Sequence, residues 1–98
     1  MRLTPYEIAA IKQTAAEVFG PAAEVRLFGS RVDDAKRGGD IDLYLEIEPG
    51  QATFQNECAF THRLEDRIGE RKIDVVLHER GGPLRPIAAI AVHTGVVL

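Results

Sequence analysis

Three aspartates, Asp40, Asp42 and Asp74, interrupt segments that are otherwise apolar. Asp40 and Asp42 are one residue apart in an alternating segment, so on a strand their carboxylates leave the same face, about 7 Å apart at the backbone. Carboxylates this close repel each other unless a hard divalent cation lies between them. Mg²⁺ is the expected ion, because it prefers oxygen ligands and shares its shell with substrate phosphates and water. Taken alone, an Asp-x-Asp pair is more typical of the solvated face of an edge strand.

The dipeptide Gly29-Ser30 follows an apolar segment and offers hydrogen-bond donors to a phosphate group. Gly29 has no side chain to obstruct a triphosphate, and the amide and hydroxyl of Ser30 suit phosphate oxygens. Gly-Ser is a common turn dipeptide, so its position before the aspartates is what gives it weight. The next segment contains three basic residues, Arg31, Lys36 and Arg37. They would contact triphosphate oxygens or an acidic partner if the loop is functional, and they would face solvent if it is an ordinary surface loop.

The elements that must position these residues follow from periodicity and from breaking residues. The segment Thr4-Pro5-Tyr6-Glu7 is typical of a capping box with proline at the first helical position. From residue 40 onwards, alternation places apolar side chains on one face and carboxylates on the other. The expected order is a helix at 5–19, strands at 24–28 and 40–47, a helix at 53–68, a strand at 72–77 and a final helix at 84–94, with an ambiguous ending at 95–98.

The second expected helix has an apolar stripe and a basic end. The stripe consists of Phe54, Cys58, Thr61, Leu64 and Ile68. Its place in that stripe predicts that Cys58 is a buried thiol. The basic end consists of Arg63, Arg67, Arg71 and Lys72, which we expect to be balanced by Glu65, Asp66 and Glu70.

Composition and charge narrow the class of protein. The chain has 98 residues, 45% hydrophobic and 28% charged, which predicts a single globular domain over 1–98 with no room for a separate substrate domain. Its formal charge of -3 does not favour non-specific binding to nucleic acid. The first 20 residues hold no continuous apolar run, so neither a signal peptide nor a membrane span is expected. One cysteine cannot form an internal disulfide, which fits a reducing cytoplasm.

Other motifs that would indicate a different chemistry are missing. His62, His78 and His93 have no metal-ligand spacing with the cysteine, so they are expected to be surface or loop residues and zinc is not indicated. The chain has no P-loop, no dinucleotide-binding glycine fingerprint and no complete EF-hand loop. Kinase, dehydrogenase and calcium-sensor functions are therefore disfavoured.

Together the motifs resemble the signature of the polymerase-β-like nucleotidyltransferase superfamily. Phe-Gly-Ser at 28–30 is followed after eight residues by Gly-Asp-Ile-Asp-Leu at 39–43, and Asp74 matches the third carboxylate. The likeness extends over about residues 24–78, and it departs from the family only at Gly39, where Ser or another small residue is common. It implies an α/β fold, with a short mixed sheet backed by helices and the carboxylates on the exposed face.

The resemblance also implies a chemistry, which is transfer of AMP from ATP with the help of two Mg²⁺ ions. Asp40 and Asp42 would bridge both ions, and Asp74 would complete the shell of the ion nearest the acceptor hydroxyl. Asp74 would also be able to accept the proton of that hydroxyl, or serve only as a ligand. The residues expected to bind the nucleotide are Gly29, Ser30, Arg31 and Gly39.

The size of the chain resembles that of stand-alone minimal nucleotidyltransferases, which are often paired with a small helical HEPN-type protein. In such pairs the helical protein is a ribonuclease toxin, and the nucleotidyltransferase is an antitoxin that adds AMP to a tyrosine of the toxin. Two alternatives stay open at this point, namely a subunit that modifies aminoglycoside-type antibiotics and a non-catalytic antitoxin that acts by contact. The apolar C-terminal residues also leave a homo-oligomer open.

Overall fold

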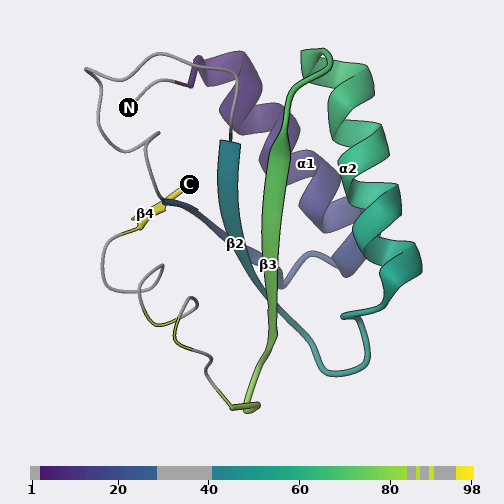
Figure 1. The fold of residues 1–98 in the computed structure, drawn as a ribbon, viewed down its shortest axis with the longest axis vertical. Helices are drawn as coiled ribbons and strands as arrows, with labels where there is room; N and C mark the ends of the chain where they lie inside the picture. The colour runs from purple at the N-terminus through teal and green to yellow at the C-terminus, as the bar shows by residue number, and fades with distance from the viewer. Residues whose placement is uncertain (1–2, 29–40, 84–85, 87–88, 90–94) are drawn as a thin grey trace.

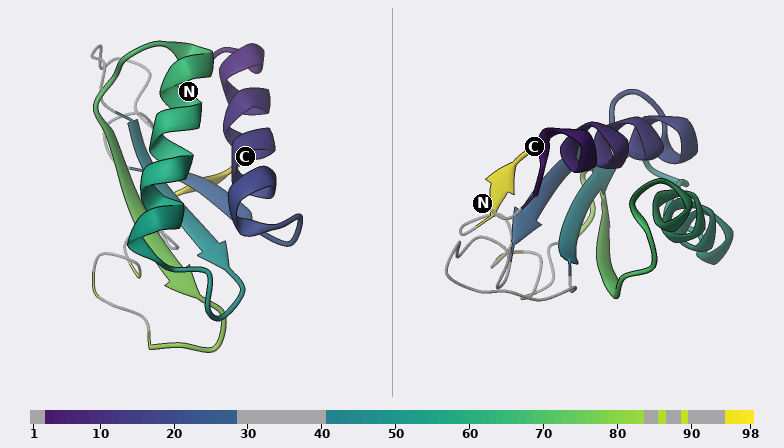
Figure 2. Two further views of the ribbon diagram at one scale, coloured as in Figure 1. Left: turned by 90° about the vertical axis from the view of Figure 1, so that its right-hand side faces the viewer. Right: turned by 90° about the horizontal axis from the view of Figure 1, so that it is seen from above.

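A computed structural model describes residues 3–28, 41–83, 86, 89 and 95–98 of the chain. They form a four-stranded mixed sheet with two helices on one face, which Figures 1 and 2 show from three sides. In chain order the elements are α1 (Pro5–Phe19), β1 (Glu24–Phe28), β2 (Ile41–Ile47), α2 (Phe54–Ile68), β3 (Ile73–Glu79) and β4 (Val96–Val97). The expected α/β class is therefore confirmed.

The strands lie in the order β3-β2-β1-β4. β1 pairs antiparallel with both β2 and β4, whereas β2 pairs parallel with β3. A parallel pair needs a crossover connection, and α2 supplies it between the end of β2 and the start of β3. In the described sheet β2 therefore has a partner on each side, and its register with those partners fixes what lies beside each of its residues.

The helix boundaries agree with the expected ones because the capping residues act as predicted. The hydroxyl of Thr4 accepts from the amide of Glu7 at 3.1 Å, and the carboxylate of Glu7 accepts from the amide of Thr4 at 2.9 Å. The helix ends before Gly20, whose φ of 100° suits a residue without a Cβ atom. Thr53 caps α2 by accepting from the amide of Asn56 at 3.1 Å.

β1 has the expected bounds, whereas the C-terminal elements differ in detail from those expected. β3 continues to Glu79, two residues beyond the expected end. Of the helix expected at 84–94, only Pro86 and Ala89 are described, and both are helical. The ambiguous ending forms β4 against β1. Within the described residues, neither α1 nor α2 has the length and apolar character that a bilayer span requires.

The main core lies between the helices and the sheet. Its side chains with no exposed surface are Ile11, Leu27, Ile41, Leu43, Leu45, Ile47, Phe60 and Leu64. Four of them alternate along β2, so one face of that strand is entirely buried, as the sequence predicts. A smaller cluster of Phe28 and Tyr44, with Val76 packed against it, lies on the opposite face.

The predicted stripe of α2 is wrong at its start. Cys58 is exposed and Phe54 is 79% exposed, whereas Phe60 is completely buried beside Leu64. At about 100° per residue, Cys58 lies about 120° around the helix from Leu64, too far to share its buried face. The predicted buried thiol is therefore wrong, because the buried face of α2 is the one that carries Phe60 and Leu64.

Polar contacts join α1 to α2. Arg67 donates through Nη1 to the buried hydroxyl of Thr14 at 2.8 Å and through Nη2 to Glu17 at 2.9 Å. Arg71 pairs with the nearly buried carboxylate of Glu7 at 2.6 Å. These basic residues of α2 and its C-terminal end were expected to be balanced by acids close in sequence, but their partners are on α1. The pairs therefore fix how the two helices lie against each other.

Replacing Phe60 with Ala should destabilise the domain by about 3–5 kcal/mol, because the change leaves a cavity in the main core. Phe54→Ala is a matched control on the same helix, and it should change the free energy of unfolding by less than about 0.5 kcal/mol because that ring is exposed. Urea unfolding measures both changes. Equal losses would contradict the burial of Phe60.

Stability should also depend on the ionisation of Glu17. Hydrogen bonding to Arg67 holds the pKa of Glu17 below its ordinary value, so the folded chain binds this proton less readily than the unfolded chain. The stabilisation by the ionised Glu17 carboxylate is therefore fully present above its unfolded-state pKa. It is lost as the pH falls through the lower folded-state pKa. We expect Glu17→Gln to melt below the wild type at pH 7 and to approach it in acid, as measured by thermal unfolding at several pH values. A constant deficit at every pH would contradict this linkage.

Candidate functional site

Asp42 and Asp74 lie directly opposite each other on the parallel strands β2 and β3. Neighbouring strands are about 4.8 Å apart, so the two carboxylates leave the sheet side by side. Because Ile41 and Leu43 are buried beneath the helices, alternation directs Asp42 to the other face. Asp42 is half-buried and Asp74 is exposed. Two of the three predicted carboxylates are thus brought together.

β1 reaches the same position from the other side. Its last residue, Phe28, pairs with Asp42 in the antiparallel ladder. β1 therefore ends beside the carboxylate pair, and the next described residue is Ile41, where β2 begins. The remaining predicted site residues lie outside the described part of the chain; these are Gly29, Ser30, Arg31, Gly39 and Asp40.

The described carboxylates suit a hard cation but do not by themselves make a complete metal centre. Side-by-side carboxylates offer the oxygen ligands that Mg²⁺ prefers, in the small number that it usually takes from a protein. Among the described residues there is no group of three or more His, Cys, Asp or Glu side chains that could hold a metal ion. Asp40, the other predicted ligand, lies outside the described residues, so its role stays a prediction.

A polar cluster next to these carboxylates was missed by the sequence analysis. We call Tyr44, Glu46 and His78 the Tyr–His–Glu cluster. The Tyr44 hydroxyl lies 3.1 Å from Nδ1 of His78 and 3.3 Å from Oε1 of Glu46, and Nδ1 lies 3.4 Å from that same Oε1. His78 is therefore no surface or loop residue, since it lies within β3 with a side chain only 12% exposed. Alternation was the available signal, because it places these side chains on the aspartate face, but sequence alone does not give the register that joins them.

Burial raises the pKa of Tyr44, and the neighbouring Glu46 raises it further. Tyr44 is only 1% exposed even though it points away from the helices. Its hydroxyl therefore keeps its proton at neutral pH and acts as a hydrogen-bond donor. The proton needs an acceptor, and both Glu46 and His78 offer one.

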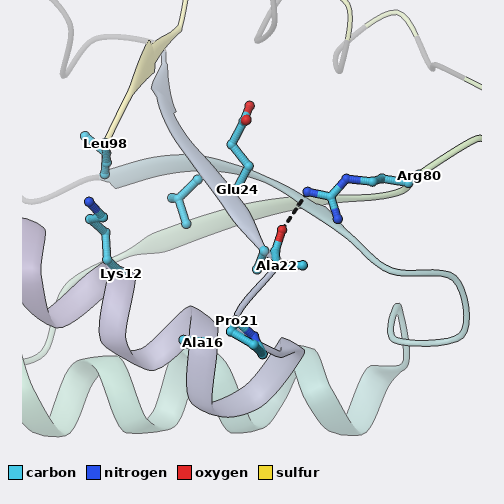
Figure 3. Close-up of a pocket in the computed structure, with 9 residues that line it drawn as sticks. Lys12, Ala16, Pro21, Ala22, Glu24, Arg80 and Leu98 are labelled. Carbon is cyan, nitrogen blue, oxygen red and sulfur yellow. Dashed lines mark hydrogen bonds between the residues drawn. The ribbon is translucent and has the colours of Figure 1, made fainter.

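A cleft of about 430 Å³ lies at the other end of β1 (Figure 3). It is lined by Lys12 of α1, by the turn after that helix, and by Glu24, Arg80 and Leu98. Arg80 is held there by the carbonyl of Ala22, to which it donates at 2.6 Å. Glu24 pairs with Glu46, four ladder positions from the pair of Phe28 with Asp42, which is roughly 13 Å along the strand. The cleft is therefore separate from the carboxylate pair.

No protein-family model matches the chain, and no curated protein does either. Among the described residues, the carboxylate pair of β2 and β3 is the feature that most clearly suits a reaction.

Asp74→Asn should stabilise the domain by about 0.2–1 kcal/mol in EDTA, because it removes one of two like charges on opposed residues. Added Mg²⁺ should raise the melting temperature of the wild type and raise that of the variant less. Asp66→Asn, on the exposed side of α2, is the matched control and should respond to Mg²⁺ as the wild type does. Equal responses of wild type and Asp74→Asn would rule out cation binding at the pair.

Proposed function

We propose that the chain is a Mg²⁺-dependent nucleotidyltransferase of the polymerase-β-like type, which transfers AMP from ATP to a hydroxyl group of a partner protein. The observation that carries the proposal is the register of Asp42 with Asp74, with Phe28 on the other side of Asp42. The reaction needs oxygen ligands for a cation next to a turn that binds phosphate. Of the family-like motifs, the described residues Phe28, Asp42 and Asp74 meet at this one position of the sheet.

The order of the described strands also supports the proposal. Among the described residues, α1 and α2 lie on one face of a short mixed sheet and Asp42 and Asp74 are on the other, as the resemblance implies. Burial of the alternate residues of β2 under the helices gives the carboxylates a firm backbone. A rigid strand holds catalytic groups in place more accurately than a loop does.

In the proposed reaction the acceptor hydroxyl attacks the α-phosphorus of ATP in line, and the bond to the bridging oxygen breaks so that pyrophosphate leaves. Asp42 and Asp74, together with Asp40, would hold Mg²⁺. When bound, the metal supplies positive charge against the triphosphate. Asp74 is the exposed carboxylate of the described pair, so it is the one that can approach the acceptor hydroxyl and take its proton. The amide and hydroxyl of Ser30, with Gly29 and Gly39 leaving room, would bind the phosphates.

The proposed acceptor is a tyrosine of a helical HEPN-type toxin, which makes the chain an antitoxin of the cytoplasm. The basis for this acceptor is the resemblance of the chain to stand-alone minimal nucleotidyltransferases. A protein acceptor would bring its own surface to the site, where the exposed Asp74 can be approached from solvent. A cytoplasmic location would also keep the exposed thiol of Cys58 reduced.

Intact-mass analysis of the partner after incubation with ATP and Mg²⁺ tests the proposal. The wild type should add an AMP-sized mass, and Asp42→Asn should slow the labelling by roughly two orders of magnitude, because the ion loses a ligand. Asp66→Asn is the matched control, which removes a carboxylate from α2 and should label the partner at the wild-type rate.

Two results would replace the proposal. If wild type and Asp42→Asn both silence the partner without changing its mass, the chain acts by contact alone. If no protein gains mass but an aminoglycoside does, the acceptor is a small molecule.

A further inference from the structure

β3 lies at one edge of the described sheet, where it pairs with β2 and with no other described strand (Figure 1). Two ladder bonds show which of its backbone groups face β2. The amide of Ile41 donates to the carbonyl of Lys72 at 2.9 Å, and the amide of Arg80 donates to the carbonyl of Ile47 at 2.8 Å. Successive residues of a strand direct their backbone groups to opposite sides, so the even-numbered residues here face β2. The odd-numbered residues therefore direct their amides and carbonyls away from the sheet.

The outward groups of β3 form a row of donors and acceptors on Ile73, Val75 and Leu77. Among the described residues, none of these amides and carbonyls has a hydrogen-bond partner, whereas the next outward carbonyl, that of Glu79, accepts from the amide of Gly82. A strand edge with free donors and acceptors can pair with an extended segment of another chain. Antiparallel pairing is the more stable arrangement per residue, and it would form two hydrogen bonds at each outward residue.

The side chains of the same edge are apolar on the helix side of the sheet and only partly covered. Ile73, Val75 and Leu77 pack against the main core, yet no side chain of β3 is buried. By contrast, Leu27 of β1 and Leu43 of β2 have no exposed surface, because each of these strands lies between two others. An added strand would give β3 the same cover if its residues opposite Ile73 and Val75 were apolar.

On the other side of the sheet, Asp74 is exposed between two outward residues. In antiparallel pairing it would occupy a position without ladder hydrogen bonds, where opposed Cα atoms are only about 4.5 Å apart. The opposed side chain would lie against the carboxylate, which accepts hydrogen bonds and so favours a hydroxyl or a basic group there. Across the sheet at this level, the order is Phe28, Asp42, Asp74 and then the added segment.

The proposed reaction decides between a hydroxyl and a basic group, because its acceptor is a hydroxyl. The proposed phosphate-binding residues follow Phe28 in the chain, and Phe28 lies on the far side of the carboxylate pair from the β3 edge. A hydroxyl on the added segment must therefore extend back across Asp74 to meet the α-phosphorus. Serine and threonine carry their hydroxyl on Cβ, next to the backbone, whereas tyrosine carries it beyond an aromatic ring. Tyrosine is also favoured in strands, so it is the residue that fits this position.

We propose that the outer edge of β3 binds an extended segment of the acceptor protein by antiparallel pairing, with a tyrosine opposite Asp74 and an apolar residue on each side of that tyrosine. The role of the tyrosine as acceptor rests on the proposed nucleotidyl transfer, whereas the binding of the segment does not. In the transfer, the phenolic oxygen forms a bond to the α-phosphorus of ATP as the bond from that phosphorus to the bridging oxygen breaks. Pyrophosphate leaves, and the phenolic proton passes to Asp74.

Hydrogen exchange of the full-length chain without ATP tests the binding. The probe is a short end-capped peptide with a central tyrosine, a valine on each side of it, and threonine and glutamine at the ends. At about ten times its Kd, the amides of Ile73 and Val75 should exchange about tenfold more slowly, because only about one chain in eleven stays free. The amides of Asp74 and Val76 already bond to β2, so they are the internal control and should change less.

Methylation of the peptide backbone shows whether the segment pairs as a strand. N-methyl groups on both valines remove the donors that face β3, and they should weaken binding at least about tenfold. An N-methyl group on the tyrosine is the matched control. The tyrosine amide faces away from β3 in the proposed pairing, so its methylation should leave the Kd nearly unchanged.

The proposal is overturned if saturating peptide leaves Ile73 and Val75 unprotected, or if both kinds of methylation weaken binding equally. Protection without peptide that grows with protein concentration would overturn it as well, because a second copy of the chain would then occupy the edge. The transfer is read separately, from the mass of the peptide after incubation with ATP and Mg²⁺, where an AMP-sized gain is expected. If the peptide binds at the edge and gains no mass, the docking edge holds and its acceptor role fails together with the proposed nucleotidyl transfer.

Discussion

The burial of one face of β2 is the constraint on which the rest of the structure depends. Ile41, Leu43, Leu45 and Ile47 have no exposed surface, so a shift of this strand by one residue would bring all four out of the core. At about 1.5–3 kcal/mol for each buried side chain, such a slip would cost more than a small domain can lose. Asp42 must therefore point away from the helices. The position of the carboxylate is in this sense a consequence of hydrophobic burial.

The pairing of β2 with β3 brings a second carboxylate next to Asp42. Parallel pairing places Asp74 opposite Asp42, and α2 provides the crossover that such a pair requires. The helix is held in turn by its own core residue Phe60 and by the contacts of Arg67 with α1. Packing of the helices on one side of the sheet thus fixes which charged groups meet on the other side, even though the helices do not contact those groups.

The local features of this fold could be predicted from sequence, because they depend on neighbouring residues. The capping box at Thr4 and the alternation around Asp42 are of this kind, and both are confirmed. The pairing of His78 with Tyr44 was missed because it depends on register between strands that are distant in sequence. The error at Cys58 has a different origin, since the two three-residue steps from Cys58 to Leu64 each turn back by about 60° and together lead about 120° around the helix.

The two halves of the β2–β3 pair differ in their electrostatics. At the start of the strands, Asp42 and Asp74 place like charges in opposed positions, which costs stability. Further along the same strands, hydrogen bonds join Tyr44 to His78 and offset part of that cost. Continuous ladder hydrogen bonds connect the halves, so attraction at one end can hold the other in register without contacting it. A sheet built in this way can keep two acids side by side without burying both of them.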